Sequence, residues 1–209
     1  MPTGTFFRLP EGKRERLIEA AWDEFTRVPF AESSINRIIQ SAHIPRGSFY
    51  QYFADKEDLF FYIQSDVRNF FLGILSDTLT NSNGDLFVTT LQAYDTLASQ
   101  NEEADFRLRR CGQLLQLNPE LGLRNIISCR PDCLPQRILQ MIDTSCFRQS
   151  DPEFVRNVCS LLFFSLGSSL IEVLFNPEQR QDSRKTLEER IHIIQCGTRC
   201  DFAPAALSQ

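Results

Sequence analysis

The segment that most constrains the fold of this chain runs from residue 33 to residue 60. Apolar residues recur there with helical spacing in two short stretches, which a tight turn at residues 41–44 separates. A third helical stretch follows at once, with Asp55 placed to cap it and Asp58 three residues later. Two short helices joined by such a turn form a helix-turn-helix, which can place its second helix in the major groove of DNA. The segment therefore predicts a helical domain built around a DNA-reading helix.

The residues around the turn define where these helices begin and end. Apolar spacing predicts an amphipathic helix at about residues 11–27. Pro29 ends it, because the residue before a proline is displaced from the helical region. Ser33 or Ser34 then caps a second helix whose isoleucines face inward. Pro45 supplies a preset first position for the third helix, the candidate reading helix.

The candidate reading helix has a polar outer face. Phe49 and Phe53 lie four residues apart and face the core. Arg46 can bond a guanine edge or a phosphate, and the small side chains of Gly47 and Ser48 let the backbone approach the groove. The remaining polar side chains suit phosphate oxygens beside the groove. The predicted DNA-binding residues are Ser34, Pro45, Arg46, Gly47, Ser48, Tyr50, Gln51 and Lys56.

The order of these residue types resembles the DNA-binding end of the TetR/AcrR family of bacterial transcriptional regulators. The resemblance is close over residues 14–60 and rests on Gly47, the aromatic run at 49–53 and the Lys-Glu-Asp-Leu run at 56–59. It implies a homodimeric repressor that binds operator DNA and is released by a small molecule. One position departs from the family pattern, because His43 stands in the turn where glycine is usual. Histidine tolerates a positive φ better than most residues, so the turn is still expected to form.

Beyond this segment the apolar spacing predicts helices and no strands. A long helix is expected from Asp55 to about Leu79, followed by a turn at residues 81–84. Further helices are expected at about residues 86–100, 103–117, 119–128, 134–149, 153–175 and 184–197. The expected fold is all-α, with a three-helix DNA-binding domain at residues 1–54 and a larger helical ligand-binding and dimerisation domain at residues 55–209.

The resemblance implies that the second domain holds both a ligand pocket and a dimer interface. The expected effector is a small apolar or aromatic molecule, for which the candidate lining residues are Phe70, Phe87, Phe106 and Phe147. The helix at 153–175 is apolar on more sides than its own chain can cover, and it carries several small residues. The predicted dimer interface comprises Leu161, Ser165, Ser168, Ser169, Leu187 and Ile191. The alternative, that both C-terminal helices are simply core, stays open.

Composition alone would not predict DNA binding. The net charge is −5, and neither the first 60 residues nor the remainder has an excess of Lys and Arg. DNA binding would therefore depend on a local basic face. No secretion signal opens the sequence, which favours the cytoplasm. The longest uncharged stretch, residues 157–171, is shorter than the roughly 20 residues that a membrane span needs. A buried helix is expected there, with no membrane partner.

Neither catalysis nor a cofactor is expected. The sequence has no Gly-rich phosphate loop, no nucleophile elbow and no His/carboxylate cluster. Seven cysteines nevertheless keep a second interpretation open, a redox- or metal-responsive DNA-binding regulator. Cys129 with Cys133, and Cys196 with Cys200, have the spacing of two thiols on one helical face. A proline or glycine interrupts each pair, so no metal site is predicted and buried thiols remain the favoured interpretation.

Overall fold

A computed structural model describes residues 1–99, 102–119 and 134–200. Within these ranges the regular structure is helical, and the only β-type pairing is one isolated antiparallel bridge between Phe147 and Arg199. The all-α prediction is therefore confirmed.

The chain divides into two compact units. The first comprises Met1–Phe70 and Arg109–Gly122, and the second comprises Phe71–Leu108 and Leu123–Gln209. This division differs from the predicted boundary between residues 54 and 55. Leu59, Phe60 and Ile63 follow that boundary in the sequence, yet they are buried within the first unit. The predicted domain boundary stays a prediction.

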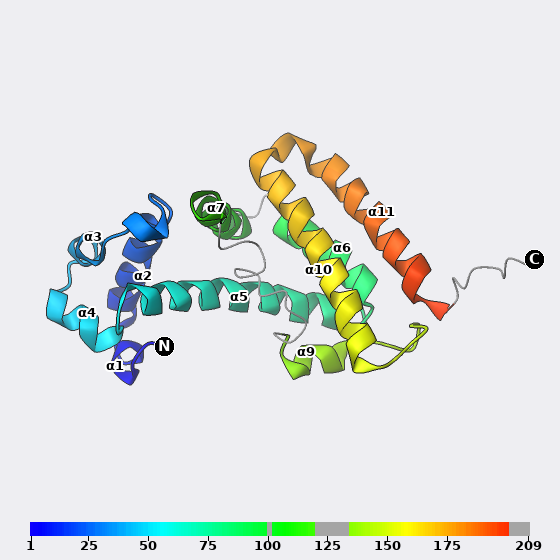
Figure 1. The fold of residues 1–209 in the computed structure, drawn as a ribbon, viewed down its shortest axis with the longest axis horizontal. Helices are drawn as coiled ribbons and strands as arrows, with labels where there is room; N and C mark the ends of the chain where they lie inside the picture. The colour runs from blue at the N-terminus through cyan, green and yellow to red at the C-terminus, as the bar shows by residue number, and fades with distance from the viewer. Residues whose placement is uncertain (100–101, 120–133, 201–209) are drawn as a thin grey trace, which may run out of the picture. The chain divides into compact units, whose positions relative to one another are not determined.

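The first unit is built from short helices around the beginning of a long one (Figure 1). Its elements are α1 (Gly4–Phe7), α2 (Glu11–Phe25), η1 (Phe30–Glu32), α3 (Ile35–Ser41), α4 (Arg46–Tyr52) and the first part of α5 (Lys56–Asn81). The predicted helices on both sides of the turn are confirmed. Leu17, Phe25 and Ile38 are completely buried, so the apolar faces of α2 and α3 form the core of this unit.

Helix α1 was not predicted, and it fastens the end of α4. Phe6 is completely buried, with its ring centroid 4.9 Å from that of Phe53 and 5.1 Å from that of Tyr62. The Thr3 N–H donates to the Tyr52 carbonyl at 2.9 Å, and the Thr3 hydroxyl donates to the Gln51 carbonyl at 2.5 Å. These bonds satisfy carbonyls at the C-terminal end of a helix, which otherwise lack partners.

Two predicted local features are confirmed next to α4. His43 has φ 54°, the left-handed conformation that lets the chain reverse between α3 and α4. The side chain of Asp55 accepts a hydrogen bond from the Asp58 N–H at 2.7 Å, so Asp55 caps α5 as expected. The reversal and the cap together set the positions at which α4 and α5 begin.

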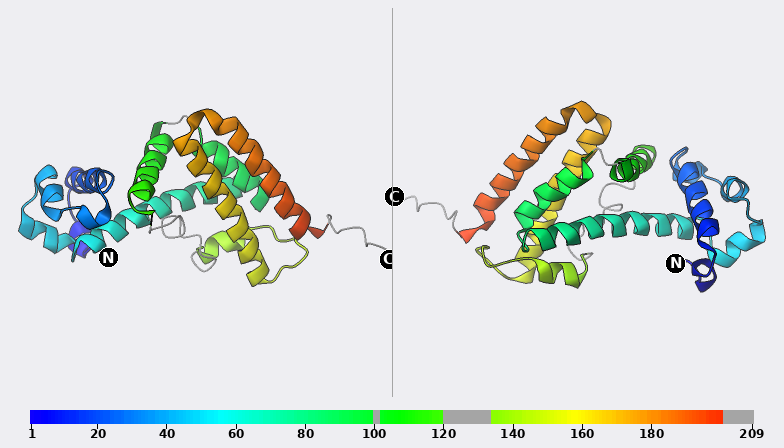
Figure 2. Two further views of the ribbon diagram at one scale, coloured as in Figure 1. Left: turned by 45° about the horizontal axis from the view of Figure 1, so that its top comes forward. Right: turned by 180° about the vertical axis from the view of Figure 1, so that it is seen from behind.

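The second unit is dominated by an antiparallel helix pair. Its elements are the remainder of α5, α6 (Leu86–Leu97), the first part of α7 (Glu102–Leu117), α9 (Gln136–Met141), α10 (Pro152–Phe175), η4 (Pro177–Gln179) and α11 (Arg180–Thr198). Helices α10 and α11 run side by side and α6 lies against both, as the views in Figures 1 and 2 agree. Leu162 of α10 and Leu187 of α11 are completely buried in this unit.

One predicted helix is too long. Helix α9 ends at Met141, whereas the prediction extended it to residue 149. The side chain of Asp143 accepts a hydrogen bond from the Ser145 N–H at 2.9 Å, a local turn that competes with helix formation. The Asp143 N–H also donates to the Gly84 carbonyl at 2.9 Å, so this segment is tied to the predicted turn at residues 81–84, which is confirmed. The helix predicted at 119–128 lies outside the described residues, apart from its first position.

Helix α10 is long and apolar enough, by length and composition, to cross a membrane. The core helix of a soluble protein passes the same test. Val158, Cys159 and Leu162 are buried where α10 packs on its neighbours, in agreement with the predicted buried helix.

Candidate nucleic-acid interface

The predicted reading face is present on α4. Arg46, Gly47, Tyr50 and Gln51 are exposed together because residues at these spacings share one side of a helix. Pro45 is also exposed and Ser48 is half-buried, whereas Phe49 and Phe53 are completely buried, as predicted. Six of the eight predicted residues therefore lie on or beside one surface. That they contact DNA remains a prediction.

Arg46 has a neighbour on α3 that sequence reasoning missed. Its guanidinium donates to the side-chain oxygen of Asn36 at 2.8 Å, and both residues are exposed. Because a guanidinium carries five N–H donors, this bond leaves others available for a base edge or a phosphate. Asn36 thus holds Arg46 on the outer surface of the two helices. In the sequence, this contact is indicated only by the position of Asn36 on the polar side of α3.

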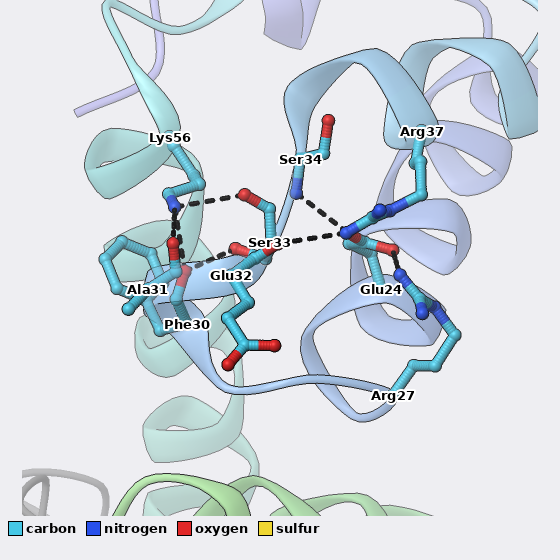
Figure 3. A network of polar contacts seen from close by, with 9 residues as sticks. All are labelled: Glu24, Arg27, Phe30, Ala31, Glu32, Ser33, Ser34, Arg37 and Lys56. Atoms are coloured by element: carbon cyan, nitrogen blue, oxygen red, sulfur yellow. Dashed lines mark hydrogen bonds and ion pairs between the residues drawn. The ribbon is translucent and has the colours of Figure 1, made fainter.

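A buried carboxylate on α2 fixes the beginning of α3 (Figure 3). Glu24 is only 4% exposed. One of its oxygens accepts from the Ser34 N–H at 2.7 Å and from Arg37 at 2.8 Å, and the other accepts from Arg27 at 2.6 Å. Arg37 also donates to the Glu32 carbonyl at 2.9 Å. The carboxylate therefore joins α2 to the first turn of α3.

The protonation of Glu24 depends on the same contacts. Burial raises the pKa of Glu24, but hydrogen bonds from Arg27, Arg37 and Ser34 outweigh burial and hold it below its usual range. Glu24 is therefore ionised at neutral pH. Charge-assisted bonds of this kind are stronger than neutral ones, so α3 is held firmly relative to α2.

Ser34 is used differently from the prediction. Its N–H binds Glu24, and its side chain makes no capping bond to α3. Figure 3 shows its hydroxyl pointing away from Glu24. Ser33 is buried, and its hydroxyl donates to the Phe30 carbonyl at 2.7 Å. Neither serine therefore caps α3 through its side chain, because Glu24 satisfies the backbone there instead.

Lys56 also has an unexpected role. Its ammonium donates to the carbonyls of Phe30 at 2.7 Å, Ser33 at 3.1 Å and Ala31 at 3.4 Å, and it lies 4.5 Å from the centroid of the Phe30 ring. An ammonium has three donors, so these carbonyls can occupy all of them. This differs from the predicted phosphate contact: Lys56 joins the start of α5 to the segment that leads into α3 (Figure 3).

The last part of α7 completes the first unit. Arg110 donates to both carboxylate oxygens of Glu19, at 3.1 and 2.6 Å, and its guanidinium lies 5.5 Å from the ring centroid of Trp22. Asn118 is completely buried, and its side-chain oxygen accepts from the Phe30 N–H at 2.7 Å. No local sequence signal pairs these residues, because about 90 positions separate the partners.

Two of the four predicted ligand-lining phenylalanines lie next to each other. Phe87 and Phe147 are buried and their ring centroids lie 5.8 Å apart. Phe106 is 50% exposed. Phe70 falls at the end of the first unit, whereas the other three belong to the second. Their role in ligand binding stays a prediction.

The predicted dimer residues separate into two groups. Ser169, Leu187 and Ile191 are buried within this chain, because they lie where α10 and α11 pack together and against α6. They are therefore not on an open face, contrary to expectation. Leu161 is exposed, and Ser165 and Ser168 are half-buried on the outer side of α10. The exposed large apolar residues of these two helices are Leu161, Phe164, Phe175 and Ile193.

Of the two cysteine pairs, only Cys196 with Cys200 lies among the described residues. Cys129 and Cys133 lie outside the described residues. Helix α11 ends at Thr198, so Cys200 lies beyond the helix and does not share a helical face with Cys196. Among the described residues no three His, Cys, Asp or Glu side chains are grouped in a way that could hold a metal ion.

A helix-turn-helix with an exposed polar face, joined to a second helical unit, is typical of DNA-binding transcriptional regulators. Residues 17–63 match the family model described as bacterial regulatory proteins, tetR family. Together with the fold, this match supports a regulator of the TetR type.

Solved structures share this fold over most of the chain. A TetR family transcriptional regulator from Chloroflexus aurantiacus is 26% identical, with 95% of this chain and 99% of that one covered and a TM-score of 0.52. A tetR-family regulator from Streptomyces coelicolor is 16% identical, with 90% and 84% covered and a TM-score of 0.60. FadR from Bacillus subtilis, solved in complex with stearoyl-CoA, is 16% identical, with 88% and 98% covered and a TM-score of 0.50.

Proposed function

We propose that this protein is a dimeric repressor that reads operator DNA with α4 and releases it when a small apolar molecule binds the second unit. It acts in the cytoplasm and by binding, without catalysis. The observation that carries the DNA-binding part is the single exposed face formed by Arg46, Gly47, Tyr50 and Gln51, with Phe49 and Phe53 anchoring the same helix from behind.

The residues on this face have separate roles. Arg46 reads a base edge, oriented by Asn36. Tyr50 and Gln51 bind phosphates beside the groove, and Gly47 lets the backbone approach. Lys56 acts mainly as a positioning residue, since carbonyls of its own chain hold its ammonium.

The dimer is proposed to form through the outer faces of α10 and α11. Leu161, Phe164 and Phe175 recur on one side of α10 and are 52–62% exposed. Apolar side chains that recur on one exposed side of a helix are typical of a contact with another chain. A shallow hollow along α11 is lined by Lys185, Glu188, Glu189, His192 and Ile193. In a two-fold contact this mixture of charges can pair with its own copy.

Sequence-specific DNA recognition also favours a dimer. One short helix makes few base contacts, whereas paired heads can read two half-sites about 34–36 Å apart. A ligand that binds better to a conformation with another head spacing would shift the population away from the DNA-bound state. The FadR structure with stearoyl-CoA supports an apolar chain as the first ligand class to try.

The decisive experiment selects operator fragments from a random DNA pool with the full-length protein. Binding of the selected duplex is then measured by fluorescence anisotropy for the parent and for the double variant Arg46→Ala/Tyr50→Ala. The double variant should lose at least tenfold in affinity while it keeps the parent's helical content. Equal affinity of the two proteins would refute the assigned reading face.

The ligand part has its own test. Saturated acyl-CoA thioesters and free aromatic compounds are screened for a rise in melting temperature, and each stabiliser is then added to the protein–operator complex. A stabiliser should release the DNA. Stabilisers that leave DNA binding unchanged would refute release by ligand without affecting the reading face.

A further inference from the structure

Two cysteines from distant parts of the chain meet beside the isolated bridge of the second unit. Phe147 pairs with Arg199 in the bridge, so the preceding residue, Cys146, lies opposite the following residue, Cys200. The Cys200 N–H donates to the Cys146 carbonyl at 3.0 Å, and the Cys200 Sγ lies 3.4 Å from the same oxygen. A second backbone hydrogen bond on the other side of the bridge fixes the register.

This pairing places the two residues within reach of a disulfide. Residues that face each other across an antiparallel pair have Cα atoms about 4.5–5.5 Å apart, and their side chains share one face. A disulfide requires a Cα separation of about 4.4–6.8 Å. Both cysteines are free thiols in the structure. The bond can therefore form with little movement of the backbone.

The surroundings of the described cysteines favour this pair. Cys200 is exposed, so a small oxidant can reach its sulfur. Cys146 is half-buried, and burial raises the pKa of its thiol, so Cys200 is the more reactive of the two toward an oxidant. Cys111 and Cys159 are buried, and burial raises the pKa of Cys159 to about 12. An accessible sulfur with a second sulfur next to it is the arrangement that oxidation converts to a disulfide.

We propose that Cys146 and Cys200 form an intramolecular disulfide when the protein meets a peroxide. The Cys200 thiol loses its proton and the thiolate attacks one oxygen of hydrogen peroxide, which breaks the O–O bond and gives a sulfenic acid. The other oxygen takes up the proton that the thiol lost and leaves as water. The Cys146 sulfur then attacks the sulfenic sulfur. The S–S bond forms and the S–O bond breaks, and a second water carries away the oxygen. Overall, two thiols are oxidised and one hydrogen peroxide is reduced to two waters.

The disulfide would close a covalent loop around the main helix pair of the second unit. Residues 146 to 200 include the whole of α10 and α11. A crosslink over a loop of this length restricts the unfolded chain and so stabilises the folded one. This site is independent of the proposed DNA-reading face, since none of its residues belongs to the first unit.

Peptide mapping tests the proposal directly, because trypsin separates the relevant cysteines. Cys146 falls in the peptide of residues 138–148, Cys196 in that of 191–199 and Cys200 in that of 200–209. The full chain is treated with one equivalent of hydrogen peroxide, alkylated under denaturing conditions and digested. Mass spectrometry should find the 138–148 peptide joined to the 200–209 peptide, and dithiothreitol should separate them.

Two variants and a melting curve sharpen the result. Cys146→Ser should abolish the crosslinked peptide, whereas Cys196→Ser should retain it. Peroxide should raise the melting temperature of the parent by several degrees and leave that of Cys146→Ser unchanged. A crosslink from Cys200 to Cys196, Cys129 or Cys133 instead, or full alkylation of Cys146 after peroxide treatment, would overturn the proposal. None of these outcomes depends on whether the protein binds DNA.

Discussion

The side-chain oxygen of Asn118 accepts a hydrogen bond from the backbone N–H of Phe30 at 2.7 Å. Asn118 also donates to the Leu114 carbonyl at 2.8 Å, so it spans from the end of α7 to η1. The Phe30 carbonyl in turn accepts a hydrogen bond from the ammonium of Lys56. Residues from three distant segments thus meet at one short 3₁₀ turn, which leads directly into α3.

Replacing Asn118 by Ala should lower the free energy of unfolding by about 1–3 kcal/mol, because a partly buried N–H loses its partner. Urea unfolding followed by circular dichroism measures this change. Gln116→Ala, at an exposed position in the last turn of α7, serves as the control and should match the parent. If Asn118→Ala also matches the parent, the bond makes no net contribution.

Lys56→Ala should distinguish a positioning residue from a phosphate contact. Loss of a phosphate contact lowers the slope of log affinity against log salt by roughly 0.9. Loss of a positioning residue instead weakens DNA binding at every salt concentration with an unchanged slope and lowers the melting temperature. We expect the second result. Anisotropy titrations at several salt concentrations decide between them, with exposed Arg137→Ala of α9 as the control.

Glu24→Gln should weaken the attachment of α3 to α2. The amide keeps an acceptor for the Ser34 N–H but loses the charge that faces Arg27 and Arg37, so we expect a loss of about 1–3 kcal/mol in unfolding free energy. The exposed Glu15→Gln on the same helix is the control. Equal stability of Glu24→Gln and the parent would show that only hydrogen bonding matters at this position.

The same carboxylate predicts a dependence on pH. The pKa of Glu24 is lower in the folded protein than its ordinary value, so its contribution is complete above the pKa of the unfolded chain and is lost as the pH falls through the folded pKa. The stability gap between the parent and Glu24→Gln should therefore be widest at neutral pH. It should close as the pH falls below about 4, the ordinary carboxyl range. A gap that widens in acid would contradict this assignment.

Gly84→Ala should destabilise the second unit by about 1–3 kcal/mol. Gly84 has φ +84°, and a Cβ there would come within 2.8 Å of the Asp143 nitrogen and closer still to the Met141 carbonyl. Gly73→Ala is the matched control, because a Cβ on this helical residue meets nothing within 4 Å. The control should be neutral or stabilising, since alanine is the better helix former. Thermal melts of both variants measure the difference.

Phe164→Glu should give a folded monomer with weakened operator binding, because it places a charge on the proposed apolar contact of α10. Sedimentation velocity at micromolar concentration measures the oligomeric state. Val88→Glu places the same charge at an exposed apolar position on α6 and should remain dimeric. A parent protein that sediments as a monomer would refute the dimer.

The features that sequence predicts well here are local ones. The positive φ of His43 and the capping by Asp55 depend on a few neighbouring residues, and both are confirmed. The partner of Glu24 was not predictable in the same way, because Arg37 meets it only after α2 and α3 have packed.

The predicted dimer residues show that helical periodicity does not reveal which chain covers an apolar face. An apolar stripe is equally compatible with contact inside one chain or between two. Leu187 and Ile191 turn out to be buried by their own chain, whereas Phe164 is exposed. Only the packing of α10 on α11 distinguishes these cases.

The division of α7 between the two units has a consequence for protein engineering. Arg110 and Asn118 lie far beyond residue 70 in the sequence, yet they pair with Glu19 and Phe30 in the first unit. A chimera that grafts residues 1–70 onto the body of another regulator would leave both partners behind. A transplanted reading head should keep its native stability only when the recipient helix carries an arginine and an asparagine at the two equivalent positions.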